Sequence, residues 1–180
     1  MRGRLFVVAG PSGVGKSTLE RRLLAEVDNL AYSVSATTRP PRPAEEEGRD
    51  YFFVSRKEFD RLVKAGELAE WAEFYGHCYG TPARFIEETL ACGQDLLVDV
   101  EVEGMAQLRD RFAEAIYILI VPPSKASLKE RLLARGTEGE AAVRQRLKRA
   151  FYELSQLLAV YQERPEGERS CEYLIVNDNL

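Results

Sequence analysis

The stretch Leu5-Phe6-Val7-Val8-Ala9-Gly10-Pro11-Ser12-Gly13-Val14-Gly15-Lys16-Ser17-Thr18 decides the fold of this chain of 180 residues. Its first five residues are an apolar run typical of a buried strand. A helical pattern follows the stretch and sets Leu19, Leu23 and Val27 on one predicted apolar face. Between strand and helix, residues 10–17 match G-x-x-x-x-G-K-[ST] at every fixed position. This order of elements predicts a phosphate-binding loop.

The composition of the loop explains how it would hold an anion. Glycine at positions 10, 13 and 15 lets the backbone curl so that its N–H groups face inward. The N-terminus of the following helix adds a partial positive charge. Lys16 supplies a full charge for the outer phosphates, and the Ser17 hydroxyl is placed to bind Mg²⁺. The motif therefore predicts a nucleotide with Mg²⁺, without saying which nucleotide or which reaction.

The composition narrows the class of protein. Apolar residues make up 45% of the chain, charged residues 30%, and the net charge is −4, which is typical of a globular domain and argues against a general nucleic-acid or membrane binder. Neither a signal peptide nor a membrane-length apolar stretch is present, so we expect a cytoplasmic protein. The three cysteines are widely spaced and predict neither a metal site nor a disulfide framework.

Apolar strand patterns alternate with helical patterns along most of the chain. This alternation predicts an α/β fold with a mainly parallel sheet flanked by helices. The segment 32–81 breaks the rhythm with short strands around one helix, and we expect it to be a small inserted α+β subdomain. We predict a single domain with a core of residues 1–31, 82–124 and 164–180. A lid and a long helix occupy 125–163.

Two details of the insert can be checked against the structure. Ser55 and Glu58 form a capping-box pattern that predicts the start of a helix ending near Gly66. Residues 76–80 are predicted as a turn. Thr81 and Pro82 are predicted as the N-cap and first residue of the next helix.

Arg39 and Arg42 lie three residues apart in a loop stiffened by prolines. If the loop is extended, both side chains can converge on one phosphate, each through a bidentate fork. The alternative is a pair of solvated surface arginines. The adjacent hydroxyl groups of Ser35, Thr37 and Thr38, together with the phenols of Tyr51 and Tyr79, favour the phosphate site.

Two acids and one hydroxyl fit the hydrogen-bonding edge of guanine. Ionised carboxylates only accept hydrogen bonds, and guanine offers N1–H and N2–H₂ donors where adenine presents a bare N1 acceptor. Glu70 and Glu101, with Thr81 as a donor to O6, would therefore select guanine. Solvated surface acids are the alternative for either glutamate taken alone.

Further charged residues are candidates for the chemistry. Asp99 follows an apolar strand, which is where a phosphate-loop enzyme places its magnesium-side carboxylate; a capping aspartate is the alternative. Arg131 and Arg135 share one helix face, and Arg146 lies on the next helix, so these helices could form a lid over a triphosphate. Ordinary helix-surface charge is the alternative, and we favour it for Arg149.

These residues together resemble the guanylate kinases among the phosphate-loop kinases. The resemblance rests on six blocks that occur in the family's order and cover nearly the whole chain: GPSGVGKST, VSATTRPPRPAEEEGRDYFF, ELAEWAEFYGHCYGT, LLVDVEVEG, RLLARGTEGE and IVND. It implies a phosphate-loop core, a GMP-binding subdomain and a lid. It also implies transfer of the γ-phosphoryl group of ATP to GMP, and to dGMP, with Mg²⁺.

The resemblance also assigns roles by matching position. ATP would be held by Gly10, Pro11, Ser12, Gly13, Val14, Gly15, Lys16, Ser17, Thr18 and Asn177. GMP would be held by Ser35, Arg39, Arg42, Tyr51, Glu70, Tyr79, Thr81 and Glu101. The metal would take Ser17 and Asp99, and the catalytic set would be Lys16, Arg39, Arg131, Arg135 and Arg146.

The chain departs from the family pattern at Glu101, where an aspartate is usual, and at Ala44, where a glycine is usual. Two rival functions stay open from the sequence. One is a kinase of similar fold acting on a ribose phosphate, and the other is a non-catalytic guanylate-kinase-like binding module. The sequence does not say whether the protein is a monomer or a homo-oligomer.

Overall fold

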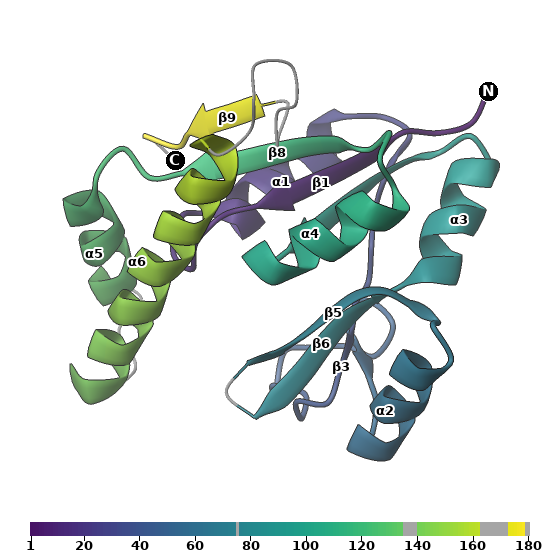
Figure 1. Ribbon diagram of the computed structural model, residues 1–180, viewed down its shortest axis with the longest axis horizontal. Coiled ribbons are helices and arrows are strands. Elements are labelled where there is room, and N and C mark those ends of the chain that lie inside the picture. Colours follow the sequence, from purple (N-terminus) through teal and green to yellow (C-terminus); the bar gives the residue numbers. More distant parts are fainter. Residues whose placement is uncertain (75, 135–139, 163–172, 179–180) are drawn as a thin grey trace. The chain divides into compact units, whose positions relative to one another are not determined.

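A computed structural model describes the chain except for residues 75, 135–139, 163–172 and 179–180 (Figure 1). The chain divides into two units. The first unit comprises Met1–Phe6, Asn29–Val98 and Glu103–Ala115, and the second comprises Val7–Asp28, Asp99–Val102 and Ile116–Leu180. The predicted bounds of core, insert and lid are drawn differently from these units and stay a prediction.

The larger sheet has five strands in the order β2-β7-β1-β8-β9. The strands β2 and β7 of the first unit pair in parallel, with Leu30 opposite Asp95, and β8 and β9 of the second pair in parallel, with Ile118 opposite Tyr173. The prediction of an α/β fold with a mainly parallel sheet is confirmed. The strand bounds are β1 Leu5–Ala9, β2 Leu30–Tyr32, β7 Asp95–Val100, β8 Ile116–Val121 and β9 Tyr173–Val176.

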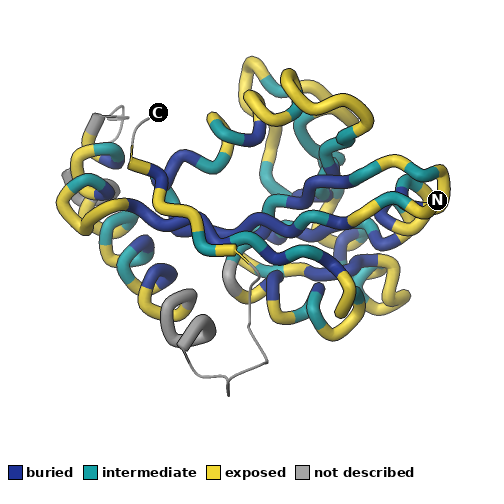
Figure 2. The backbone as a smooth tube through the Cα atoms, turned by 90° about the horizontal axis from the view of Figure 1, so that it is seen from above, coloured by how far each residue is buried: buried dark blue, intermediate teal, exposed yellow. Residues whose placement is uncertain are grey.

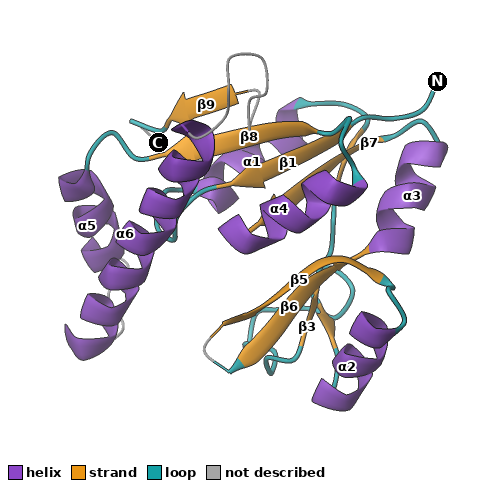
Figure 3. Ribbon diagram, in the orientation of Figure 1, coloured by secondary structure: helices purple, strands orange, loops and turns teal. Residues whose placement is uncertain are grey.

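The first unit also contains a four-stranded sheet in the order β4-β3-β6-β5, with one helix packed on it (Figure 3). The helix α2 (Arg56–Lys64) buries Phe59 in a cluster with Ala36, Leu68 and Cys78. The Ser55 hydroxyl accepts a hydrogen bond from the Glu58 N–H, so the predicted helix start is confirmed. The remaining bounds are β3 Ala36–Thr37, β4 Phe52–Phe53, β5 Leu68–Phe74, β6 His77–Pro82, α3 Ala83–Ala91 and α4 Val102–Arg111.

Two predictions about residues 76–82 are wrong. Residues 77–82 form the strand β6 rather than a turn, because β5 and β6 make a tight antiparallel hairpin with Gly76 at positive φ. Thr81 lies in this strand opposite Glu70, and Pro82 is the residue that precedes α3. The Thr81 side chain therefore contacts Glu70 across the hairpin and does not cap the helix.

The second unit contains the helices α1 (Lys16–Glu26), α5 (Lys125–Ala134) and α6 (Glu140–Gln162). Leu128 and Leu132 of α5 pack against Ala150 of α6. The long helix predicted within residues 125–163 is confirmed, and Ser124 caps α5 through its hydroxyl. Figure 2 marks buried residues in dark blue, and they include four of the five residues of β1 and four of the six residues of β8.

The prediction that Leu19, Leu23 and Val27 form an apolar face of α1 is wrong. Leu23 is 41% exposed and Val27 is 45% exposed, whereas Glu20 is only 5% exposed. Glu20 lies one helical turn after Lys16, so the buried face of α1 carries charged rather than apolar groups. Within the described part of the chain, no helix combines the length and apolarity needed to cross a membrane.

Candidate functional site

The phosphate-binding loop of the second unit joins β1 to α1 in a tight curl. Gly13 and Gly15 have φ values of 85° and 101°, a region that favours glycine. Gly15 directly precedes the first residue of α1. The first N–H groups of this helix, which have no acceptor within the helix, therefore lie next to the loop. The curled loop before a helix N-terminus that the sequence predicts is therefore present.

The side chains of Arg131 and Asn177 fix the loop through hydrogen bonds to its backbone. Asn177 donates from Nδ2 to the Val14 carbonyl over 2.8 Å, and Arg131 donates from Nη1 to the same carbonyl over 3.1 Å. Arg131 Nη2 also binds the carbonyls of Asn177 and Asp178. Both side chains, predicted as phosphate and adenine ligands, thus bind loop and strand backbone here. Arg135, predicted beside Arg131, lies outside the described residues.

Lys16 is the central charge of the loop. Its Nζ donates to the Gly10 carbonyl over 2.6 Å and lies 3.6 Å from Asp99 Oδ1. Burial would lower the pKa of Lys16, but the carboxylates around it, Asp99 and then Glu101 foremost, outweigh burial and hold the pKa above its usual value. The ammonium group is therefore charged and available to a phosphate.

Glu20 and Asp99 form a hydrogen-bonded pair of acids beside Lys16. Burial, followed by the charge of Asp99, raises the pKa of Glu20 to about 8. Burial also raises the pKa of Asp99, although Lys16 and the hydrogen bond from Glu20 counteract it. At neutral pH the pair holds one proton, which we place on Glu20. This role is not evident from the sequence, because Glu20 has the pattern of a surface residue.

The residues near Lys16 fit a Mg²⁺ ion that is also held by its nucleotide. Ser17 is the second residue of α1, and Asp99 Oδ1 is buried without a hydrogen-bond partner. Hydroxyl and carboxylate oxygens are the ligands Mg²⁺ prefers, and it usually takes few from the protein. In the described ranges of the chain, His, Cys, Asp and Glu form no group of three that could hold a metal ion.

Glu153 of α6 contacts the loop, and Arg149 of the same helix binds Glu153; neither was assigned to the loop from the sequence. Glu153 Oε2 accepts a hydrogen bond from the Ser12 N–H over 3.0 Å, and its Oε1 accepts from Arg149 over 2.5 Å. The prediction that Arg149 is ordinary surface charge is therefore wrong. The i,i+4 spacing of Arg149 and Glu153 indicates a pair, but it cannot place that pair against the loop. Arg146, one turn earlier, is partly exposed.

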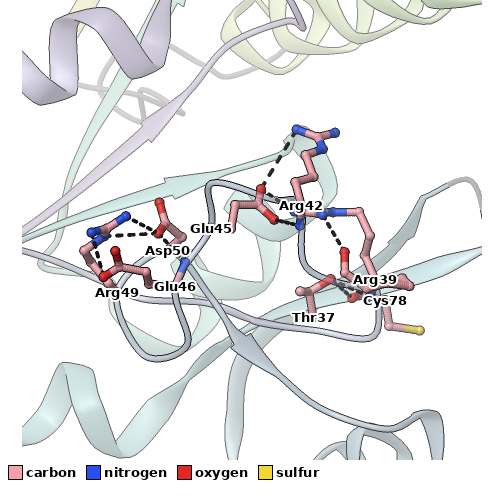
Figure 4. Close-up of polar contacts among 9 residues, drawn as sticks. Thr37, Arg39, Arg42, Glu45, Glu46, Arg49, Asp50 and Cys78 are labelled. Carbon is pink, nitrogen blue, oxygen red and sulfur yellow. Dashed lines mark hydrogen bonds and ion pairs between the residues drawn. The ribbon is translucent and has the colours of Figure 1, made fainter.

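Arg39, a predicted phosphate ligand of the first unit, lies beside Glu45 (Figure 4). Its guanidinium carbon lies 5.4 Å from the Tyr51 ring centroid, and its side chain hydrogen-bonds to Tyr79. The two tyrosine rings meet edge to face at 6.1 Å. The structure thus brings these three predicted ligands together. The Arg42 side chain is 74% exposed, and its Nη1 lies 4.0 Å from Glu45 Oε1, the oxygen that also accepts from Arg39 Nη2.

Glu70 and Thr81, the predicted guanine ligands of the first unit, touch each other. Thr81 Oγ1 donates to Glu70 Oε1 over 2.6 Å, and both residues are buried. This bond uses the single hydroxyl proton, so Thr81 offers guanine an acceptor and cannot also donate to O6 as we expected. Glu101, the third predicted ligand, belongs to the second unit, where burial raises its pKa to about 7. Ser35 is half-buried next to β3.

Comparisons with known proteins agree on one family. The family model "Guanylate kinase" matches residues 2–180. The chain is 42% identical over 180 residues to a guanylate kinase of Thermotoga maritima, covering all of this chain and 82% of the relative. It is 48% identical over 178 residues to one of Parasynechococcus marenigrum, covering 99% and 92%. The crystal structure of guanylate kinase from Anaplasma phagocytophilum matches with a TM-score of 0.70 at 33% identity, covering 98% of this chain and 77% of that one.

The raised pKa of Glu20 predicts how stability depends on pH. The folded protein keeps a proton on Glu20 up to about pH 8, whereas the unfolded chain loses it near the ordinary pKa of about 4.3. The stabilisation from this group is full below the unfolded pKa and is lost as pH rises through the folded one. We therefore expect the thermal midpoint of unfolding of Glu20→Gln to fall less than that of the wild type as the pH rises from 5 to 8.

Glu26→Gln is the matched control, because Glu26 lies on the same helix in an exposed pair with Arg22. Its profile should run parallel to that of the wild type. Parallel profiles for all three proteins would show that Glu20 does not hold the proton.

Proposed function

The chain belongs to the guanylate kinase family, and from this premise we propose that it transfers the γ-phosphoryl group of ATP to GMP and gives ADP and GDP. The observation that carries the proposal is the intact phosphate loop, with Lys16 charged beside Asp99. The first unit supports the proposal, because it contains a separate set of groups suited to a nucleoside monophosphate: Arg39 with two tyrosines for the phosphate, and Glu70 for the base. We expect dGMP to be accepted too, because the assigned groups recognise phosphate and base.

ATP would bind to the second unit. Backbone N–H groups of the loop would hold its phosphates, apart from those of Ser12, Val14 and Thr18, which donate within the protein. Lys16 would neutralise the outer phosphates. Ser17 and Asp99 would hold Mg²⁺, which reduces the charge on the phosphates when it is bound with ATP. Asn177 and Arg131 would support the loop by binding the Val14 carbonyl. We propose Arg135 and Arg146 as further phosphate ligands.

GMP would bind to the first unit. Arg39 would take the phosphate together with the Tyr51 and Tyr79 hydroxyls, and Arg42 and Ser35 would complete this set. Glu70 would accept from the guanine N1–H and N2–H₂ groups, with Thr81 as a second acceptor. We propose that Glu101 still reads guanine despite its extra methylene.

The reaction needs positioning and charge neutralisation more than it needs a base. The attacking oxygen of GMP belongs to a phosphate that is already ionised, so no strong general base is required. Holding donor and acceptor in line converts a bimolecular step into a unimolecular one. The cationic groups then stabilise the charge that spreads over the transferred phosphoryl group.

An ADP-release assay with ATP, Mg²⁺ and a panel of nucleoside monophosphates tests the function. We expect GMP to be turned over far faster than AMP, CMP or UMP. Equal rates with a ribose phosphate substrate would favour the rival kinase. Binding of GMP without any ADP release would favour a non-catalytic binding module.

Replacing Lys16 by alanine tests the ATP side. We expect Lys16→Ala to lower kcat by about a hundredfold or more, since electrostatic groups at the reacting centre contribute on this scale. Lys129→Ala is the control, because Lys129 is an exposed lysine of α5 in the same unit. Circular dichroism would verify that both variants fold. Near-normal turnover in Lys16→Ala would remove this residue from the mechanism.

Replacing Glu70 by glutamine tests guanine recognition. A hydrogen bond to a charged group contributes about 1.5–3 kcal/mol, so we expect kcat/KM for GMP to fall about ten- to a hundredfold and the preference over AMP to narrow. Glu73→Gln is the control on the same strand, since Glu73 is exposed and pairs with Arg56. If Glu101→Ala leaves kcat/KM for GMP intact while Glu70→Gln reduces it, guanine selection rests on Glu70 and Thr81 alone.

A further inference from the structure

Glu45 is a carboxylate among the phosphate ligands of the first unit, and no role was assigned to it from the sequence. Its Oε1 accepts a hydrogen bond from Arg39 Nη2 over 2.7 Å. Its Oε2 accepts from the Arg42 backbone N–H over 2.8 Å (Figure 4). The Glu45 N–H in turn donates to the Arg42 carbonyl over 3.0 Å. One side chain therefore connects the Arg39 guanidinium to the backbone of Arg42.

The Arg39–Glu45 pair is well shielded from water. The two side chains are 13% and 15% exposed, whereas those of the neighbouring pair Arg49–Glu46 are 59% and 66% exposed. Exposed ion pairs contribute little, while shielded ones are screened less and hold their geometry. The hydrogen bond from Arg39 lowers the pKa of Glu45 below its usual value, so the carboxylate is ionised at neutral pH.

Arg39 is held on several sides besides Glu45. Its Nη1 donates to the Pro40 carbonyl over 2.7 Å, its guanidinium lies over the Tyr51 ring, and Tyr79 hydrogen-bonds to it. A guanidinium group has five N–H donors in a rigid plane. Fixing part of them to Pro40 and Glu45 sets the direction of the others without consuming them all.

A carboxylate beside a phosphate-binding arginine has two possible effects. As a competitor, it would imitate a phosphate by placing both oxygens on the guanidinium fork, and the incoming phosphate would have to displace it. Glu45 instead places one oxygen on Arg39 and the other on the Arg42 N–H. This geometry is that of a support for the arginine, because Glu45 occupies only one of the five guanidinium N–H donors.

We propose that Glu45 is a positioning residue for the GMP phosphate, which orients Arg39 and fixes the loop that carries Arg42. The proposal rests on the proposed function, in which these two arginines receive that phosphate. A residue that orients a binding side chain before the nucleotide arrives lowers the entropic cost of ordering that side chain on binding. Its loss should therefore weaken the binding of a nucleotide through its phosphate and leave ATP binding unaffected.

Glu45→Gln keeps the size of the side chain but removes its charge, and one of its two acceptors becomes a donor. We expect it to raise the KM for GMP about tenfold, with kcat and the KM for ATP each changed less than about twofold. Glu46→Gln is the matched control in the same loop, because Glu46 pairs with exposed Arg49. The control should keep wild-type constants.

Titration calorimetry with GMP and guanosine separates positioning from general loss of structure. Glu45→Gln should weaken binding of GMP about tenfold and leave binding of guanosine, which lacks the phosphate, unchanged. In an Arg39→Lys background the effect of Glu45→Gln on GMP should shrink, because the two residues act as one unit. Equal losses for both ligands would overturn the proposal in favour of a structural role.

Three further outcomes are decisive. Tighter binding of GMP by Glu45→Gln would overturn positioning in favour of competition for Arg39. Wild-type constants in Glu45→Gln, with GMP active in the wild type, would overturn the role of Glu45 alone. A wild-type protein that does not phosphorylate GMP would instead overturn the proposed function, and this result is obtained before any variant is made.

Discussion

The buried ammonium group of Lys16 is the interaction on which the second unit depends. Four acids act on its pKa, namely Asp99, Glu101, Glu20 and Glu153, and they come from β7, the residue after it, α1 and α6. Removing two charges from water costs more than a single contact returns unless hydrogen bonds complete the site. Lys16 has such a bond to the Gly10 carbonyl, and Glu153 binds the Ser12 N–H. The loop is therefore shaped by its polar partners as much as by its glycines.

The first unit also holds a shielded cation beside an acid. Arg39 must keep a positive charge in a shielded place, and Glu45, the Pro40 carbonyl and two tyrosines stabilise it there. The prolines around it restrict the backbone before any ligand arrives. In both units, then, acids near a cation hold the cation in position, and the same acids influence how a phosphate approaches it.

The sequence predicts the fold better than the contacts within the site. Strand β1, the curl at Gly13 and Gly15 and the cap at Ser55 depend on local patterns, so a single stretch of sequence reveals them. The buried face of α1 was missed because an apolar count cannot indicate that Glu20 faces Asp99. The roles of Arg131 and Glu153 depend on contacts 117 and 141 residues away along the chain. Periodicity carries no information about such distant partners.

The charge balance around Lys16 bears on how ATP would enter the site. Lys16 and Arg149 face four acids, and the raised pKa values of Glu20, about 8, and Glu101, about 7, reduce the excess of negative charge. A triphosphate adds further negative charge, and each added anion makes ionisation of these acids less favourable. A divalent cation beside Asp99 acts in the other direction, because it lowers the pKa of adjacent acids. Binding of ATP and of a cation should therefore be coupled, and protons held by these acids are the means by which the site adjusts its charge.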